Sequence, residues 1–302
     1  SIIDKLEKKL GKIVLSSNQA LIWDTLEKIG KNNSINGKDT GMNTNFYDFD
    51  AITQGLENGN LYIFASRPAM GKTSFVSNLA LNFSKSYKHP VCFFSLEINK
   101  LMLGCRLISQ EVGIESGRLK SGKLQQEEWM ILERCIKSLS KNNIYINDDS
   151  TITINKIIEF CSIAKKNNDN KLGMIVIDNF QLLEEKITGD NFTSKDQLNN
   201  IIKQLKSLAL SQNIPIILTS QVESRVDFRV NKRPMLSDLR DSELLEDYAD
   251  LIAFIYRDEY YDPYSEDRGI TEIIVAKQRN GPVGTVKLLF EPQYTRFRNL
   301  AI

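Results

Sequence analysis

Histidine is almost absent from this sequence, and cysteine is sparse. The 302 residues include one histidine, His89, which excludes any site with two or more histidine ligands, such as a histidine-rich zinc site. A general base is therefore expected to be a carboxylate. The four cysteines, Cys92, Cys105, Cys135 and Cys161, form no Cys-x-x-Cys pair. We expect them to be reduced, buried thiols of an intracellular protein.

Long apolar runs and an excess of charge are also lacking. No run approaches the about 20 apolar residues of a membrane helix, and the first residues lack the apolar core of a signal peptide. We therefore expect no membrane partner and a cytosolic or organellar-matrix location. The net charge is only +1, so nucleic-acid binding would have to come from a local basic patch or from assembly. With 41% hydrophobic and 25% charged residues, the composition is that of a globular protein.

Two parts of unequal length are predicted. Ile2, Ile3, Leu6 and Leu10 recur at helical spacing, residues 20–29 form a second helical stretch, and residues 31–41 are rich in Asn, Gly and Lys. Because this segment is too short to bury an apolar face by itself, we expect it to dock elsewhere. We predict a helical linker and tether over residues 1–40 and one domain over residues 41–302.

Short β-rich runs alternate with helical stretches from residue 61 onward. The expected strands cover residues 61–66, 91–96, 173–178, 215–220, 251–256 and 272–277. The expected helices cover residues 72–85, 101–111, 125–140, 154–166 and 196–212. Several strands are apolar at successive positions, which is typical of a parallel sheet covered on both faces. The pattern predicts an α/β domain with a mostly parallel central sheet flanked by helices.

A phosphate-binding loop is predicted between the first expected strand and helix. Its residues are Ser66, Arg67, Pro68, Ala69, Met70, Gly71, Lys72, Thr73 and Ser74. Backbone N–H groups at the start of a helix bind phosphate, and the helix dipole favours negative charge there. Lys72 is expected to reach the β- and γ-phosphates, and the Thr73 hydroxyl to hold Mg²⁺. Ser66 stands where the motif usually has its first glycine.

Three polar side chains follow other expected strands. Asp178 ends the strand 173–178, where a carboxylate can bind Mg²⁺; Glu97 follows the strand 91–96 and is placed to activate water. Gln221 follows the strand 215–220, and its amide is placed to contact a γ-phosphate. Taken alone, an aspartate here is more often a helix cap or turn residue, and a glutamate is often an ordinary surface residue. The phosphate loop upstream favours the functional interpretation.

Two basic segments lie near the carboxyl end. The loop 224–241 carries Arg225, Arg229, Lys232, Arg233 and Arg240, together with Asp241. A solvated loop without a partner is the ordinary interpretation of such a run, but a long polar loop in a compact domain is usually functional, and its cations suit a phosphate backbone. Lys277 and Arg279 lie two residues apart on an expected strand, so both point to one side and can reach a phosphate of their own or of a neighbouring subunit.

With these residues in place, the chain resembles the C-terminal motor domain of the DnaB family of replicative DNA helicases, which is a RecA-like ATPase. Residues 41–82, FFSLE at 93–97, MIVIDNFQLL at 174–183, LTSQ at 218–221, and the segments 232–261 and 272–299 carry the likeness in order. The segment 2–10 is similar to the linker helix of that family. The resemblance implies a RecA-like P-loop ATPase fold preceded by a helical linker, with ATP and Mg²⁺ as cofactors.

The resemblance also implies a role for each motif. Glu97 takes the place of the catalytic glutamate, Asp178 of the Mg²⁺-associated aspartate, and Gln221 of the γ-phosphate sensor. Arg240 and Asp241 take the places of two residues near the DNA backbone, and Lys277 and Arg279 those of cations that act on the ATP of the adjacent subunit. Further implied partners are single-stranded DNA, five further copies in a hexameric ring, a primase and a helicase loader.

Two positions depart from the pattern of the family. Glu243 stands where a glycine is usual, and Tyr248 where an acidic residue is usual, so the predicted DNA contact is affected more than the ATP chemistry. The function expected is an ATP-dependent helicase of a bacterial cytoplasm, a phage-infected cell or a plastid stroma. The alternatives are a RecA-like recombinase that does not unwind DNA and a nucleotide-gated helicase-loader scaffold.

Overall fold

A computed structural model describes residues 41–141, 143–183 and 194–300 of the chain. The linker helix and tether predicted for residues 1–40 lie outside the described residues. No helix in the part of the chain that is described has the length and apolarity needed to cross a membrane.

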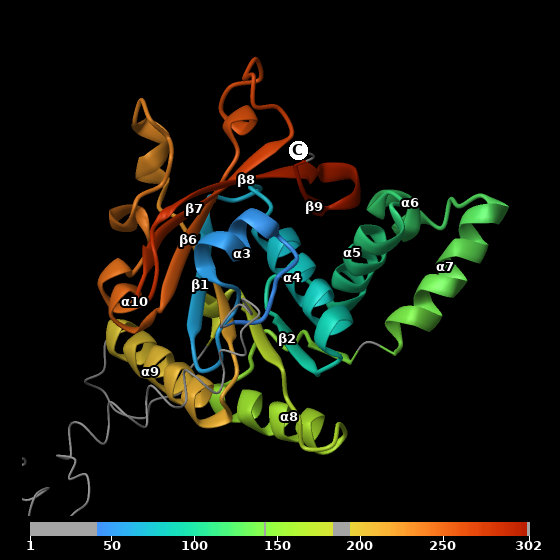
Figure 1. The fold of residues 1–302 in the computed structure, drawn as a ribbon, viewed down its shortest axis with the longest axis horizontal. Coiled ribbons are helices and arrows are strands. Elements are labelled where there is room, and N and C mark those ends of the chain that lie inside the picture. The colour runs from blue at the N-terminus through green and yellow to red at the C-terminus, as the bar shows by residue number, and fades with distance from the viewer. Residues whose placement is uncertain (1–40, 142, 184–193, 301–302) are drawn as a thin grey trace, which may run out of the picture. The chain divides into compact units, whose positions relative to one another are not determined.

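Helices and strands alternate along the chain, and all six expected strands and five expected helices are present (Figure 1). The strands are β1 Leu61–Ser66, β2 Val91–Ser95, β3 Ile144–Asn147, β4 Met174–Asp178, β5 Ile216–Gln221, β6 Leu251–Tyr256, β7 Ile270–Gln278, β8 Gly284–Glu291 and β9 Arg296–Asn299. The helices are α3 Tyr47–Thr53, α4 Lys72–Tyr87, α5 Lys100–Val112, α6 Ser116–Ser121, α7 Gln126–Leu139, α8 Ile154–Lys166, α9 Ser194–Gln212 and α10 Ser242–Tyr248.

All the described strands belong to one sheet, in the order β3-β2-β4-β5-β1-β6-β7-β8-β9. The strands from β3 to β6 in this order pair in parallel, whereas β7, β8 and β9 extend the sheet as an antiparallel edge. The mostly parallel sheet predicted from the sequence is therefore confirmed. Because parallel strands present their carboxyl ends at one edge, β1, β2, β4 and β5 bring the residues that follow them together.

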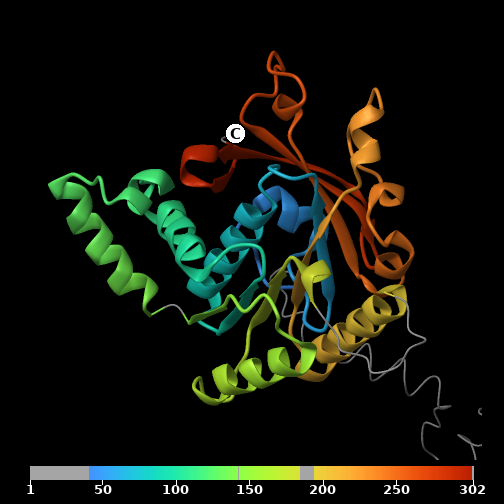
Figure 2. The same cartoon turned by 180° about the vertical axis from the view of Figure 1, so that it is seen from behind.

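Both faces of the sheet are covered, which explains the uninterrupted apolar runs. In β1, Leu61, Ile63 and Ala65 pack with α8, α9 and α10, whereas Tyr62 and Phe64 pack with α3, α4 and α5. Figure 2, seen from behind, shows α8 and α9 on the side of the sheet away from α4 and α5. The result is a three-layer arrangement in which successive side chains of a strand enter opposite cores.

The sequence patterns missed β3, β8 and β9, and the helices α3, α6 and α10. β3 is four residues long, and β8 alternates between buried and exposed positions, so neither has the apolar run that marked the other strands. β9 has only one buried residue, Phe297, and forms because it pairs with β8. Tertiary pairing therefore decides these edge strands.

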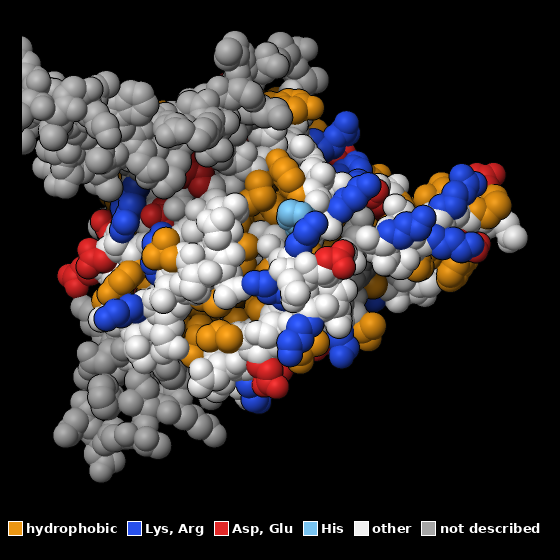
Figure 3. All heavy atoms as spheres, turned by 60° about the horizontal axis from the view of Figure 1, so that its bottom comes forward, with side chains coloured by type: hydrophobic (Ala, Val, Ile, Leu, Met, Phe, Trp, Pro, Cys, Tyr) orange, Lys and Arg blue, Asp and Glu red, His pale blue; other side chains and the backbone are white. Residues whose placement is uncertain are grey.

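The structure also shows where the cysteines, the single histidine and the charged side chains lie. The four cysteines are free as expected, but Cys105 is half-buried rather than buried, because α5 turns this residue toward a surface groove. His89 is half-buried, ahead of the buried Pro90. On the face drawn in Figure 3, Lys and Arg side chains lie among acidic and apolar ones.

Candidate functional site

A cleft of about 400 Å³ lies where the carboxyl ends of the parallel strands meet the start of α4. Its lining residues are Ser66, Arg67, Pro68, Ala69, Gly71, Lys72, Thr73, Ser74, Glu97, Ile98, Arg106, Gln221, Arg257, Phe290 and Pro292. Most of the predicted phosphate loop therefore faces one cavity, together with Glu97 and Gln221 from neighbouring strands. The volume is in the range of small-molecule sites.

The phosphate loop has a backbone that only certain residues adopt easily. Gly71, which caps α4, has φ 95°, and a Cβ built on it would lie 3.1 Å from the Phe297 ring. The positive φ favours glycine here, and the Phe297 ring would have to move to admit a side chain. Because α4 begins at the next residue, its first N–H groups are free of helical partners and can bind an anion.

Two loop residues have side chains that do not enter the cleft freely. The Met70 side chain is buried in the core formed with α3 and α4. The Arg67 guanidinium binds both carboxylate oxygens of Asp227, at 2.8 and 3.3 Å, and the carbonyl of Val222. Arg67 thus ties the phosphate loop to the basic loop 224–241. Any nucleotide contact from Met70 is left to its backbone.

Lys72 and Asp178 are buried ionisable groups beside the cleft. Burial lowers the pKa of Lys72, although the charges of Asp178 and Glu97 oppose this shift; the Lys72 Nζ donates to the Ser220 carbonyl at 3.2 Å. Burial raises the pKa of Asp178, opposed by the hydroxyls of Thr219 and Thr73 and by the Lys72 charge. Because perturbed ionisable groups in a cleft are typical of functional sites, this pair supports the prediction.

The Asp178 carboxylate is only half satisfied. Its Oδ1 accepts a hydrogen bond from the Thr219 hydroxyl at 2.5 Å. Its Oδ2 is buried and has no hydrogen-bond partner among the described residues. An unpaired buried carboxylate oxygen is costly, and a cation is the group that would satisfy it.

Glu97 is held by two amide side chains. Its Oε1 accepts from Asn179 Nδ2 at 3.0 Å and from Gln221 Nε2 at 3.5 Å. Asn179 directly follows Asp178, so the ends of β2, β4 and β5 converge on this carboxylate. The arrangement leaves Oε2 of Glu97 available for another contact. A general base needs such an oxygen to receive a proton.

Sequence reasoning missed three polar residues in or beside this site. Asn179 lies beside the predicted Asp178, and its position after a buried strand was the available signal. Arg106 lies on α5, and burial lowers its pKa, with Asp178 and Glu97 opposing. Arg257, which follows β6, stacks on the Phe290 ring at 4.6 Å and pairs with Glu259. Nothing in the local sequence distinguishes these arginines from surface ones.

The basic loop divides into internally paired and exposed cations. Arg229 pairs with the buried Asp238 at 2.6 Å, Arg233 pairs with Glu272 at 2.7 Å, and Lys232 donates to the Asp227 carbonyl. The side chains of Arg225 and Arg240 are 57% and 65% exposed; Arg225 pairs with Glu223 at 3.1 Å and with Asp238 at 3.7 Å, and Arg240 pairs with Asp241 at 4.0 Å. The sequence predicts contact with a phosphate backbone for all five cations, whereas the structure divides them by their exposure and their partners.

Lys277 and Arg279 lie away from the cleft that contains Lys72. The Lys277 Nζ donates to the carbonyls of Glu246 and Ala249, and the Arg279 guanidinium donates to the carbonyl of Asp247. Both cations therefore rest at the carboxyl end of α10, where the helix dipole is negative. Neither lines the cleft of its own chain.

The two departures from the family pattern both fall on α10. Glu243 is exposed in the first turn, two residues after Asp241, and Tyr248 ends the helix with its ring against the core below. Asp241 caps α10 with φ 59°. The helix thus joins the end of the basic loop to the segment on which Lys277 and Arg279 rest.

The comparisons with known proteins agree with this geometry. The DnaB-like helicase C-terminal domain family matches residues 41–299. A probable replicative DNA helicase of Trieres chinensis is 43% identical, with 85% of this chain and 57% of that protein aligned. The replicative DNA helicase DnaB of Geobacillus stearothermophilus is 37% identical over 99% of this chain and 67% of its own length.

A solved structure of a DnaB-like replicative helicase, described with its interactions with primase, superposes with a TM-score of 0.85 at 37% identity. The match covers 95% of this chain and 68% of that one. The chain therefore spans between about half and two thirds of the length of these relatives. The predicted RecA-like α/β fold is confirmed, and the family match implies that the chain binds a nucleotide. On fold, motifs and family match together, the chain belongs to the DnaB-like helicase C-terminal domain family.

Proposed function

We propose that this chain is the motor domain of an ATP-dependent replicative DNA helicase that moves on single-stranded DNA as a hexameric ring and unwinds the duplex at the fork. The observation that carries the proposal is the convergence of Lys72, Asp178 and Glu97 on one cleft. Hydrolysis of a nucleoside triphosphate needs a loop that binds the phosphates, here with Lys72, and a carboxylate that binds the metal ion, here Asp178. It also needs a carboxylate that is positioned to activate water, here Glu97.

The buried side chains fit a magnesium ion with its triphosphate. The unpaired Oδ2 of Asp178 and the Thr73 hydroxyl supply the oxygen ligands that Mg²⁺ prefers. The ion would neutralise charge on the phosphates. Lys72 supplies a further positive charge, and the backbone of residues 66–74 supplies N–H donors.

Glu97 is proposed as the base that orients and deprotonates the attacking water. Asn179 holds its Oε1 and so leaves the other oxygen for water. Gln221 contacts the same Oε1 at 3.5 Å, so a γ-phosphate that attracts the Gln221 amide would also change the hydrogen bonding of Glu97. Arg106 and Arg257 add positive charge to the cleft wall.

The arrangement of cations supports a shared active site. Because Lys277 and Arg279 do not line the cleft of their own chain, we assign them to the ATP of an adjacent subunit, where such an arginine is worth about 10³ to 10⁵ in rate. A linker helix in residues 1–40 would dock on a neighbour in the ring. Arg225 and Arg240, with Asp241 beside them, are assigned to the DNA backbone, while Arg229, Lys232 and Arg233 stabilise the loop that carries them.

The partners and place of action follow from the relatives. A primase is proposed because a DnaB-like relative is described with one, and a helicase loader is proposed by the same likeness. The related helicases come from Trieres chinensis and from a bacterium, which supports a bacterial cytoplasm, a phage-infected cell or a plastid stroma.

The test compares Glu97→Gln with the wild-type chain in ATPase and strand-displacement assays. We expect the variant to bind nucleotide normally and to lose about 10²- to 10⁴-fold in turnover, because a positioned base supplies that factor. Glu133→Gln is the matched control, since this carboxylate is exposed on α7 and, among the described residues, forms an ion pair with Lys137 alone. If single-stranded DNA stimulates the ATPase activity of the wild-type chain but no strand displacement occurs, the recombinase is favoured. If single-stranded DNA does not stimulate the ATPase activity at all, the scaffold is favoured.

A further inference from the structure

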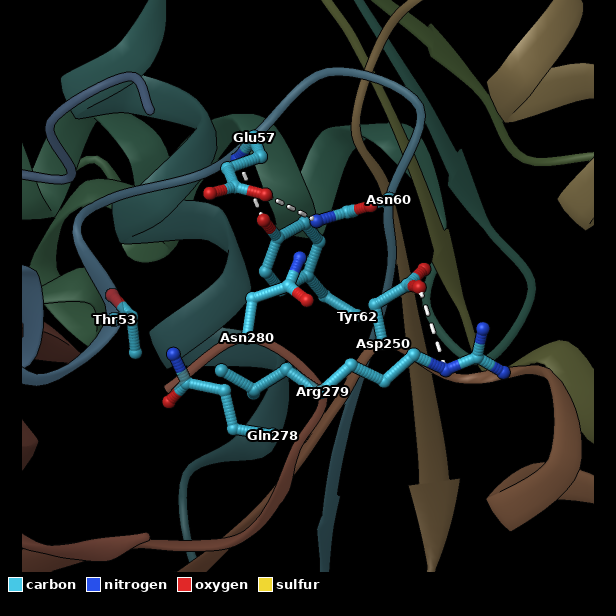
Figure 4. A pocket seen from close by; sticks show the side chains of 9 residues that line it. Thr53, Glu57, Asn60, Tyr62, Asp250, Gln278, Arg279 and Asn280 are labelled. Carbon is cyan, nitrogen blue, oxygen red and sulfur yellow. Dashed lines mark hydrogen bonds and ion pairs between the residues drawn. The ribbon is translucent and has the colours of Figure 1, made fainter. Parts of the chain in front are cut away.

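Asp250 is a buried carboxylate that the proposed mechanism does not use. It precedes β6 and is 8% exposed. A small cavity beside it, of about 20 Å³, is lined by Tyr62, Gln278 and Arg279 among others (Figure 4). Buried carboxylates are rare unless they are paired, so the partners of Asp250 indicate what it is for.

The two oxygens of Asp250 face different groups. Oδ2 accepts from the Leu61 N–H at 2.7 Å and from the Lys206 Nζ at 2.5 Å. Oδ1 faces the Arg279 Nε at 3.7 Å. The first pair of contacts fixes the carboxylate against β1 and α9, which belong to the rigid core. The second contact then presents a fixed negative charge to Arg279.

The main chain reinforces this arrangement. Leu251 pairs with Gln278 in the antiparallel register of β6 and β7, which places Asp250 opposite Arg279. The Arg279 N–H donates to the Asp250 carbonyl at 2.9 Å. Figure 4 shows the Asp250 carboxylate and the Arg279 side chain directed toward one another. Among the described residues, Asp250 is the one carboxylate that forms an ion pair with this guanidinium.

We propose, in an inference that rests on the proposed function, that Asp250 is a positioning residue for Arg279. Asp250 orients the Arg279 guanidinium toward the nucleotide of the adjacent subunit. Arg279 is 45% exposed, and its guanidinium is restrained by two contacts, the Asp247 carbonyl on one Nη and the Asp250 carboxylate facing Nε; without the second it would sample more rotamers. Reactive geometry tolerates little displacement, and a shift of 1 Å can cost about 100-fold in rate. Asp250 therefore acts on a site in another copy of the chain, through Arg279.

The first test separates positioning from stability. Asp250→Asn keeps the acceptor for the Leu61 N–H but removes the charge. Lys206→Gln removes the Lys206 contact, but the Leu61 N–H still holds the carboxylate, so its charge continues to face Arg279. We expect Asp250→Asn to lower the kcat for ATP about 10- to 100-fold with KM within about twofold, and Lys206→Gln to keep kcat within about twofold. Asp250→Glu, which retains the charge but moves it by one methylene, should also lower kcat and serves if the asparagine variant does not fold.

The second test asks whether the defect acts on a neighbour. Asp250→Asn subunits have an intact cleft, and Lys72→Ala subunits have an intact Arg279, so mixing two poorly active proteins should restore turnover at their shared interfaces. No recovery on mixing, or an equal kcat loss in Lys206→Gln, would overturn the inference. Full turnover in Asp250→Asn while Arg279→Ala is inactive would overturn it and leave the proposed function standing. Full turnover in Arg279→Ala itself would overturn both.

Discussion

Phe75 joins the start of α4 to the core, and its truncation tests how much the aromatic packing beneath the predicted phosphate loop stabilises the fold. The side chain is fully buried in the first turn of α4. Its ring lies 5.4 Å from that of Phe46, 5.1 Å from that of Phe64 and 5.3 Å from that of Phe297. One residue thus connects the segment before α3, the strand β1 and the edge strand β9.

The expected cost of Phe75→Ala follows from this environment. Burial of a phenylalanine removes about 150 to 250 Å² from water, worth about 4 to 6 kcal/mol at 25 cal/mol per Å². Alanine recovers part of this, and measured truncations of buried phenylalanine cost about 3 to 5 kcal/mol. We expect the upper half of that range, because three ring contacts are lost together.

Thermal unfolding followed by circular dichroism measures this cost. At about 2 to 4 °C per kcal/mol for chains of this size class, Phe75→Ala should lower the Tm by about 8 to 20 °C. Tyr47→Ala on α3 is the control, since this ring is 73% exposed and its loss should change stability by less than about 0.5 kcal/mol. A fall of less than about 1 kcal/mol in Phe75→Ala would show that the aromatic cluster is not a cooperative part of the core.

Three further predictions concern the cleft and the basic loop. Gly71→Ala should weaken binding of a fluorescent ATP analogue at least about 10-fold, because its φ of 95° and the ring 3.1 Å from a Cβ both oppose a side chain. Asp178→Asn should abolish turnover yet raise the Tm without nucleotide: burial raises the pKa of this carboxyl, so the stability of its neutral form is lost as pH rises through the folded pKa. The Tm gain should therefore grow as pH rises from the ordinary range of an aspartate pKa toward the raised folded pKa, and a gain that is the same at every pH would contradict the reasoning. Arg240→Met should leave the Tm unchanged and reduce the salt slope of single-stranded DNA binding by about 0.7. Arg229→Met should cost about 1 to 3 kcal/mol, because the buried Asp238 loses its closest ion-pair partner but keeps the Met235 N–H at 2.8 Å and Arg225 at 3.7 Å.

The sequence alone predicted the central strands and the strand-end residues. The runs that became β1, β2, β4, β5 and β6 are mostly apolar at successive positions, because both of their faces are buried, and this pattern is visible without a structure. The edge strands β8 and β9 were not predicted, since their pairing partners rather than their own residues determine them.

Within the site, the local sequence determined which residue types were available, and the tertiary structure decided which of them meet. A strand that ends in a carboxylate and a glycine before a helix are local signals, so Asp178, Gly71 and Lys72 could be named in advance. The separation of Arg229 from Arg240 could not, because burial and the position of Asp238 depend on chain segments that only folding brings together. The same holds for Asp250 and Arg279, which are 29 residues apart and become neighbours through the register of β6 and β7. Consecutive residues determine the local backbone conformation, whereas the pairing of charges depends on long-range packing.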